Sequence, residues 1–90
     1  MLAAEHRETV TVALLQQLDA AHPNPMSVDT LLIPLKSSGL PHITKPDIES
    51  LLVDLLDKGW VHAVENHAAS EIKRYRRTDT ARAWLRVNGF

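Results

Sequence analysis

The fold of this chain is decided by the stretch Thr44-Lys45-Pro46-Asp47-Ile48-Glu49-Ser50-Leu51-Leu52-Val53-Asp54-Leu55-Leu56-Asp57-Lys58-Gly59-Trp60-Val61. Five of its apolar residues recur at the spacing of one helix face: Ile48, Leu51, Leu52, Leu55 and Leu56. Thr44 is a good N-cap, and Pro46 and Asp47 suit the first helical turn. Gly59 is the residue type that most often follows a helix end, in the left-handed conformation. The stretch therefore predicts an amphipathic helix over residues 44–58, followed by a strand.

The residues after this helix predict a pair of strands and a further helix. Trp60 to Glu65 has the composition of a strand, Asn66 to Ser70 that of a polar turn, and Glu71 to Arg77 that of a returning strand. Thr78 is placed to cap a last helix that extends to about Asn88. Its apolar residues are expected to pack back on the core: Ala81, Trp84, Leu85 and Phe90.

The residues before residue 44 predict two more helices. Glu5 to Ala21 carries apolar residues at helical spacing, and the prolines of His22 to Pro25 end it. Met26-Ser27 is a candidate for a short bridging strand, with Ser27 as N-cap of the second helix. Pro34 lies inside that helix and predicts a kink or a new turn, because proline lacks the backbone N–H. Residues 37–43 have the composition of a loop.

Length and composition predict a single small domain. The chain has 90 residues, of which 44% are hydrophobic, enough for one modest core. It contains no cysteine, which excludes disulfides and thiolate metal sites and fits a reducing compartment. No apolar run approaches the roughly 18 residues of a membrane span, and the N-terminus lacks the apolar core of a signal peptide. We therefore expect one cytoplasmic domain over residues 1–90, without a membrane partner.

Charge is spread unevenly along the chain, although the formal net charge is only −1. Residues 1–60 hold four basic and eight acidic residues, a balance of −4. Residues 61–90 hold six basic and three acidic residues, a balance of +3. The sequence therefore predicts a dipolar molecule whose C-terminal third would contact a polyanion.

Two stretches resemble parts of winged helix-turn-helix regulators. Ile48 to Val61 resembles their recognition helix and first wing strand, where a leucine-rich helix ends in a charged residue, glycine, a large apolar residue and valine. A second stretch is similar to the second wing strand and following helix of the MarR-like and PadR-like transcriptional regulators: Lys73-Arg74-Tyr75-Arg76-Arg77-Thr78-Asp79-Thr80-Ala81-Arg82-Ala83-Trp84-Leu85. The resemblance covers roughly residues 26–86. It implies a mainly helical α+β fold, a winged helix with a three-helix helix-turn-helix core, a β-hairpin wing and a C-terminal helix.

Two positions depart from the pattern of those regulators. Arg77 stands where the family usually places an apolar residue, which changes how the wing strand must pack. Thr80 and Ala81 stand near a position often held by glycine, which is a smaller departure.

The resemblance implies DNA binding and transcription regulation, and the basic residues are the expected contacts to the DNA backbone. Those residues are Lys45, Lys73, Arg74, Arg76, Arg77, Arg82 and Arg86. Strand alternation divides part of this set between two faces: Arg74 and Arg76 on one, and Lys73, Tyr75 and Arg77 on the other. The alternative interpretation is a solvated, charged strand that protects the edge of a sheet.

The exposed face of the recognition helix contains no lysine or arginine. Its residues are Pro46, Glu49, Ser50, Val53, Asp54 and Asp57. Side chains that recognise base edges are usually arginine, lysine, asparagine or glutamine, and phosphates repel carboxylates. Lys45 and Lys58, at the two ends of the helix, are its only cations. The sequence therefore predicts backbone contacts through the wing in preference to base recognition by this helix.

The alternative function is a winged-helix protein–protein interaction module that does not bind DNA, such as a subunit of an assembly or a phage accessory protein. Its interaction surface would be the acidic face that also carries an apolar residue: Glu49, Val53, Asp54 and Asp57. A protein partner or a homodimer would occupy this surface. A homodimer is compatible with DNA binding as well, because it would double the basic patch.

The sequence offers little for catalysis or for a cofactor. It has no cysteine, no glycine-rich phosphate loop and no serine, histidine and acid set whose geometry the spacing fixes. His62, Glu65 and His67 lie close together in the chain, but strand alternation separates His62 from Glu65 and no helical metal-binding spacing occurs. We therefore expect neither an enzyme nor a metal or cofactor site.

Overall fold

The computed structural model describes residues 4–64 and 73–89 of the chain. Within these ranges the elements follow the predicted order of helix, short strand, two helices, two strands and a helix. They are α1 (Ala4–Ala21), β1 (Met26–Ser27), α2 (Val28–Ser37), α3 (Lys45–Asp57), β2 (Val61–Val64), β3 (Arg74–Arg77) and α4 (Asp79–Val87). The expected turn from Asn66 to Ser70, the strand residues Glu65, Glu71 and Ile72, and Phe90 lie outside the described residues.

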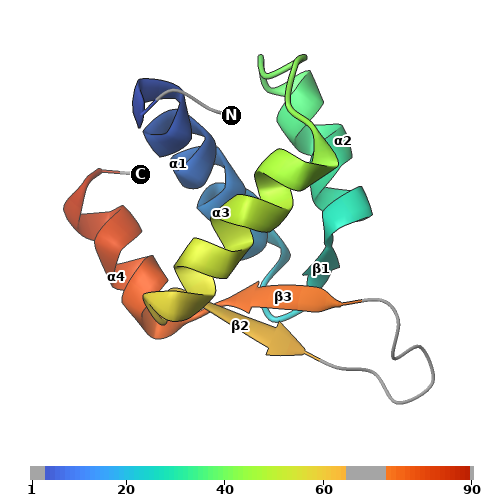
Figure 1. Ribbon diagram of the computed structural model, residues 1–90. Coiled ribbons are helices and arrows are strands. Elements are labelled where there is room, and N and C mark those ends of the chain that lie inside the picture. Colours follow the sequence, from blue (N-terminus) through green and yellow to red (C-terminus); the bar gives the residue numbers. More distant parts are fainter. Residues whose placement is uncertain (1–3, 65–72, 90) are drawn as a thin grey trace.

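The strands form an antiparallel sheet in the order β1-β3-β2. Met26 of β1 lies opposite Tyr75 of β3, and Ala63 of β2 lies opposite Tyr75 from the other side. Figure 1 shows α1, α2 and α3 together on one side of this sheet. The result is a mainly helical α+β fold that is compatible with a winged helix.

Side-chain caps begin three of the helices. Ser27 accepts a hydrogen bond from the backbone N–H of Thr30 at the start of α2. Thr44 and Asp47 form a reciprocal capping box at the start of α3, as the sequence predicts. Thr78 caps α4, and its hydroxyl also donates to the carbonyl of Gly59 at 2.8 Å. This last contact holds the start of α4 against the corner between α3 and β2.

Helix α2 contains Pro34 and is nevertheless one continuous element from Val28 to Ser37. The sequence predicted either a kink or a new turn at Pro34, and the helix does not start a new turn there. The reason lies on either side of the proline, where Leu31 and Leu35 are fully buried. Their burial offsets the one backbone hydrogen bond that proline cannot donate.

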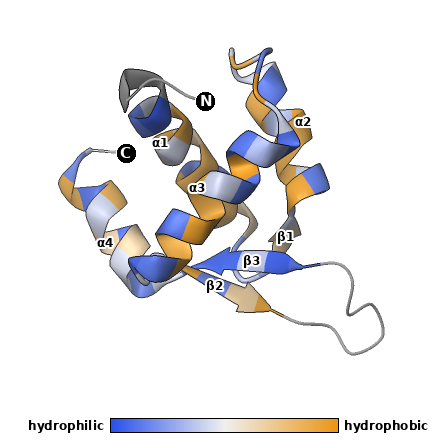
Figure 2. Ribbon diagram, in the orientation of Figure 1, coloured by the Kyte–Doolittle hydropathy of each residue, from blue (hydrophilic) through white to orange (hydrophobic). Residues whose placement is uncertain are grey.

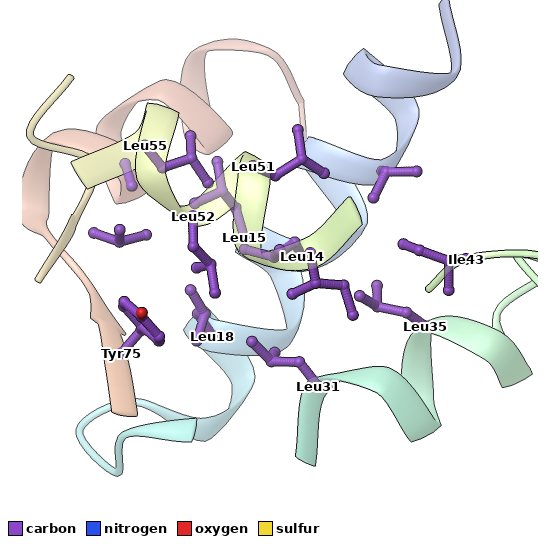
Figure 3. Packing of buried hydrophobic residues seen from close by; sticks show 14 of the residues in the cluster. Leu14, Leu15, Leu18, Leu31, Leu35, Ile43, Leu51, Leu52, Leu55 and Tyr75 are labelled. Atoms are coloured by element: carbon purple, nitrogen blue, oxygen red, sulfur yellow. The ribbon is translucent and has the colours of Figure 1, made fainter. Parts of the chain in front are cut away.

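The core lies between the helices and the sheet. Helix α1 contributes the leucines that the other elements surround, and Figure 3 shows Leu14, Leu15 and Leu18 facing α2, α3 and Tyr75. The buried residues of the core are Val10, Leu14, Leu15, Leu18, Leu31, Leu35, Ile43, Ile48, Leu51, Leu52, Leu55, Val61, Tyr75, Ala81 and Leu85. Leu56, which the sequence places in the same stripe, is instead 37% exposed and does not belong to this core, because it lies at the margin of the helix face that packs inward. No helix among the described residues combines the length and apolarity needed to cross a membrane.

Replacing Gly59 with alanine should lower the free energy of unfolding by about 1–2 kcal/mol, since the left-handed region costs an L-residue that much. Gly59 has a φ of 74°, and an added Cβ would meet no heavy atom within 4 Å. Backbone strain is therefore the expected cause, and urea unfolding measures it. Ser50→Ala, at an exposed position of α3, is the control that should change stability little. A loss well above 3 kcal/mol at Gly59 would contradict the strain argument.

Candidate nucleic-acid and protein interfaces

Strand β3 presents its two sides to different surroundings. Tyr75 is buried against the core, whereas Arg74 and Arg76 lie on the opposite side, as strand alternation predicts. The register pairs Arg76 with His62 and Arg74 with Val64. We call the surface of these four residues, His62, Val64, Arg74 and Arg76, the outer sheet face. It lies on the side of the sheet that faces away from α1, α2 and α3 (Figure 1).

The cations of this region form no ion pair within the described part of the chain. Arg74 and Arg76 are half-buried and Lys73, directly before β3, is exposed. Within residues 4–64 and 73–89, no carboxylate forms an ion pair with any of the three. Figure 2 shows β3 as hydrophilic along most of its length. Arg74 and Arg76 therefore present two cationic side chains on the outer sheet face, whereas alternation places Lys73 on the side of Tyr75.

Arg77 and Arg82, two of the residues expected to contact the DNA backbone, both bind Asp19 of α1. The Nε of Arg77 lies 2.5 Å from Oδ1 of Asp19, and Nη1 of Arg82 lies 2.6 Å from Oδ2. The Arg77 side chain is only 11% exposed and also lies 3.7 Å from the carboxylate of Asp79. This cluster explains the arginine at an apolar position of the resembling family, because its charge is neutralised on the inner side of β3.

The electrostatics of Asp19 reflect both its burial and its partners. Burial acts to raise the pKa of the Asp19 carboxyl, but the hydrogen bonds and charges of Arg82 and Arg77 outweigh it. The pKa of Asp19 therefore lies below its ordinary value of 3.8. Asp19 stays ionised at neutral pH and holds the end of α1, the end of β3 and the start of α4 together.

Lys45 and Arg86, the remaining two residues expected to contact the DNA backbone, lie away from the outer sheet face. Lys45, at the start of α3, forms an ion pair with Asp29 of α2. The hydrogen bond and the charge of Asp29 raise the pKa of Lys45. Arg86 is exposed on α4, without an ion pair to any described residue. The structure thus brings together Arg74 and Arg76 on the outer sheet face, and places Lys73 on the side of Tyr75 and Lys45, Arg77, Arg82 and Arg86 elsewhere.

The expected interaction surface lies on one exposed face of α3. Val53 is 63% exposed, and Glu49, Asp54 and Asp57 around it are exposed as well. Asp54 forms an ion pair with Arg7 of α1. Within the described ranges, Glu49 and Asp57 have no ion pair. The face therefore carries two uncompensated carboxylates on either side of an apolar side chain, at positions 49, 53 and 57 of one helical row.

A groove of about 440 Å³ lies beside this face, between α3, β3 and the start of α2. Its lining is Ser27, Val28, Asp29, Glu49, Val53, Lys73 and Tyr75. Burial raises the pKa of the Tyr75 hydroxyl, and the charge of Glu49 raises it further. The carboxylates of Asp29 and Glu49 therefore line the same groove as the cation of Lys73.

Sequence reasoning missed two residues of these interfaces. Asp19 is separated from Arg77 by 58 positions, so no local pattern connects them. The one signal was the arginine at an apolar position, which requires a buried counter-charge somewhere in the fold. Asp29 lies in the first turn of α2, and its ion pair with Lys45 depends on how α2 packs against α3, which no local pattern shows.

Comparison with protein-family models and with curated proteins finds no match for this chain. In the described ranges, no three His, Cys, Asp or Glu side chains gather as metal ligands would. Glu65 and His67, named with His62 as the nearest approach to such a set, lie outside those ranges. The case for a function therefore depends on the charges and geometry of the two interfaces.

Proposed function

We propose that this chain is a small winged-helix DNA-binding protein that contacts the DNA backbone through its wing and acts as a transcriptional regulator. The order of the elements and the three-stranded sheet support a winged helix, with β2 and β3 as the wing. The observation that carries the function is the pair of Arg74 and Arg76 on the outer sheet face, neither of which forms an ion pair with a described residue. Such cations bind phosphates by releasing counterions, without dependence on sequence.

The acidic surface of α3 supports a restricted mode of binding. Glu49 and Asp57 are exposed on the helix that would enter the major groove, and Asp29 lies at the start of the preceding helix. Carboxylates in these places repel phosphates, and no arginine or lysine is available there to recognise guanine. In the proposed mode of binding, the protein therefore approaches the duplex with its outer sheet face and keeps α3 away from the bases.

Replacing Arg74 and Arg76 together with alanine should weaken binding to mixed-sequence duplex DNA by about tenfold to a hundredfold near 0.1 M salt. The slope of log affinity against log salt concentration should fall by about 2, one for each lost phosphate contact. Fluorescence anisotropy across a salt series measures both quantities. Circular dichroism should show an unchanged fold, because both side chains lie on the outer sheet face.

A matched control removes the same charge elsewhere. Lys36 and Lys58 are exposed at the ends of α2 and α3, so Lys36→Ala with Lys58→Ala changes the net charge equally and should leave the salt slope nearly unaltered. Asp54→Ala should leave affinity unchanged or increase it. Absence of binding by the unaltered protein at low salt would reject the proposal, and so would equal losses in the two double variants.

One observation favours the second candidate, a protein–protein interaction module. Val53 is 63% exposed beside the groove of about 440 Å³, and the carboxylates of Glu49 and Asp57 flank it. Apolar side chains in partly enclosed, polar-rimmed surfaces are common in protein interfaces. If DNA binding is absent while Val53→Glu abolishes capture of a protein partner, the module is the correct function.

A further inference from the structure

The exposed face of α4 has a composition opposite to that of α3. Arg82, Ala83, Arg86 and Val87 are all exposed on it, and Val87 is the most exposed large apolar residue of the described chain, at 86%. Arg82 and Arg86 are four positions apart and share one helical row. Asp79, Ala83 and Val87 share the adjacent row, and Asp79 lies in the first turn of α4, with its carboxylate 3.7 Å from Nη1 of Arg77. We call Arg82, Ala83, Arg86 and Val87 the basic α4 face.

The two helix faces are complementary in charge and in apolar content. On α3, Val53 is followed four positions later by Asp57 on the same helical row; on α4, Val87 follows Arg86 in the sequence and lies on the adjacent row. Neither Asp57 nor Arg86 has an ion pair to another residue in 4–64 or 73–89. Each face thus offers an exposed valine and a charge that no described residue pairs, Asp57 on α3 and Arg86 on α4, and Glu49 adds a second such carboxylate on α3.

We propose that a second copy of this chain binds through these faces, with the basic α4 face of each copy on the α3 face of the other. Val87 packs against Val53, and Arg86 forms an ion pair with Asp57. A single contact between two helix faces is small compared with the roughly 1,200 Å² that a stable interface buries. The contact joins two different faces, so the proposed assembly is a symmetric dimer in which a twofold axis forms the contact twice and doubles the buried area.

The proposed dimer leaves the outer sheet face of each copy uncovered. His62, Arg74 and Arg76 take no part in either helix contact, so self-association does not depend on DNA binding. The acidic surface of α3 is covered by a cationic partner instead of facing solvent. In this pairing, Asp57 and Val53 both contact the second copy.

Charge reversal on each face separately, and then on both together, tests the pairing. Sedimentation velocity over a concentration series at low and moderate salt should show a monomer–dimer equilibrium for the unaltered protein. Arg86→Glu should weaken it by about tenfold or more, and Asp57→Lys should do the same, because each places like charges in contact. The variant with both changes restores opposite charges and should associate within about threefold of the original.

Two further variants serve as controls for this test. Lys36→Glu makes the same change of charge on the exposed surface of α2 and should not alter association. Val53→Glu should abolish the dimer while circular dichroism and thermal unfolding stay unchanged, because Val53 lies outside the core. A protein that remains monomeric up to millimolar concentration overturns the proposal. Failure of the double charge reversal to restore association overturns it as well, and so does a mass larger than that of a dimer.

Discussion

Replacing Leu52 with alanine should lower the free energy of unfolding by about 2–5 kcal/mol, the loss expected for truncating a fully buried leucine. Leu52 is only 1% exposed, and Figure 3 places it among Leu15 and Leu18 of α1 and Tyr75 of β3. Alanine would remove the apolar contacts and leave a cavity that three surrounding elements cannot easily fill. Urea unfolding followed by circular dichroism measures the loss.

Val53→Ala is the matched control for Leu52→Ala, because the two residues are adjacent on the same helix. Val53 is 63% exposed, so its replacement should change stability by less than about 0.5 kcal/mol. A Leu52→Ala loss below about 1 kcal/mol would mean that this face of α3 is not packed in the core.

Replacing Asp19 with asparagine should cost about 1–3 kcal/mol of stability, because it removes the charge on which two arginines depend. Arg77 is the more sensitive partner, since its side chain is 11% exposed and its other carboxylate, Asp79, lies 3.7 Å away. Arg82 is 44% exposed and is better solvated when the pair is lost, so its share is smaller. Thermal or urea unfolding at neutral pH measures the combined effect.

The cost of Asp19→Asn should depend on pH in a defined direction. The folded protein lowers the pKa of Asp19, so folding favours the ionised carboxylate. Its contribution is complete above the ordinary carboxyl pKa of about 4 and is lost as pH falls through the lowered value. The difference in unfolding free energy between the original protein and Asp19→Asn should therefore be constant near neutral pH and shrink below about pH 4.

Asp29→Asn is the control for the Asp19 variant. Asp29 also forms an ion pair, with Lys45, but both side chains are more than half exposed. Solvent screens such a pair, so its loss should leave the unfolding free energy almost unchanged at every pH. Equal effects of the two asparagine variants would contradict the structural importance assigned to Asp19.

The helices and strands could be predicted because their signals are local. The capping box of Thr44 and Asp47, the stripe of α3 and Gly59 all lie within 16 consecutive residues, and the structure has the helix and its end there. The alternation of β3 likewise predicted that Arg74 and Arg76 lie on the face opposite to Tyr75. In each case the chain within a few residues determines the geometry.

The interfaces could be predicted only in part, because they depend on contacts between distant segments. The sequence grouped Arg77 and Arg82 with the other cations, since nothing near them shows that one carboxylate of α1 binds both. It identified Val53 as exposed, but the groove beside Val53 needs α2, α3 and β3 in place. Burial and charge pairing are decided by packing, which a single sequence specifies only indirectly.

The cluster around Asp19 constrains which substitutions this fold can accept over evolutionary time. Arg77 is tolerable on the inner side of β3 because Asp19 supplies its counter-charge, and Asp19 is tolerable at 23% side-chain exposure because two guanidiniums surround it. Either change alone would leave a poorly solvated charge without its partner. In homologous chains, positions 19 and 77 should therefore vary together: where residue 77 is apolar, residue 19 should no longer be acidic.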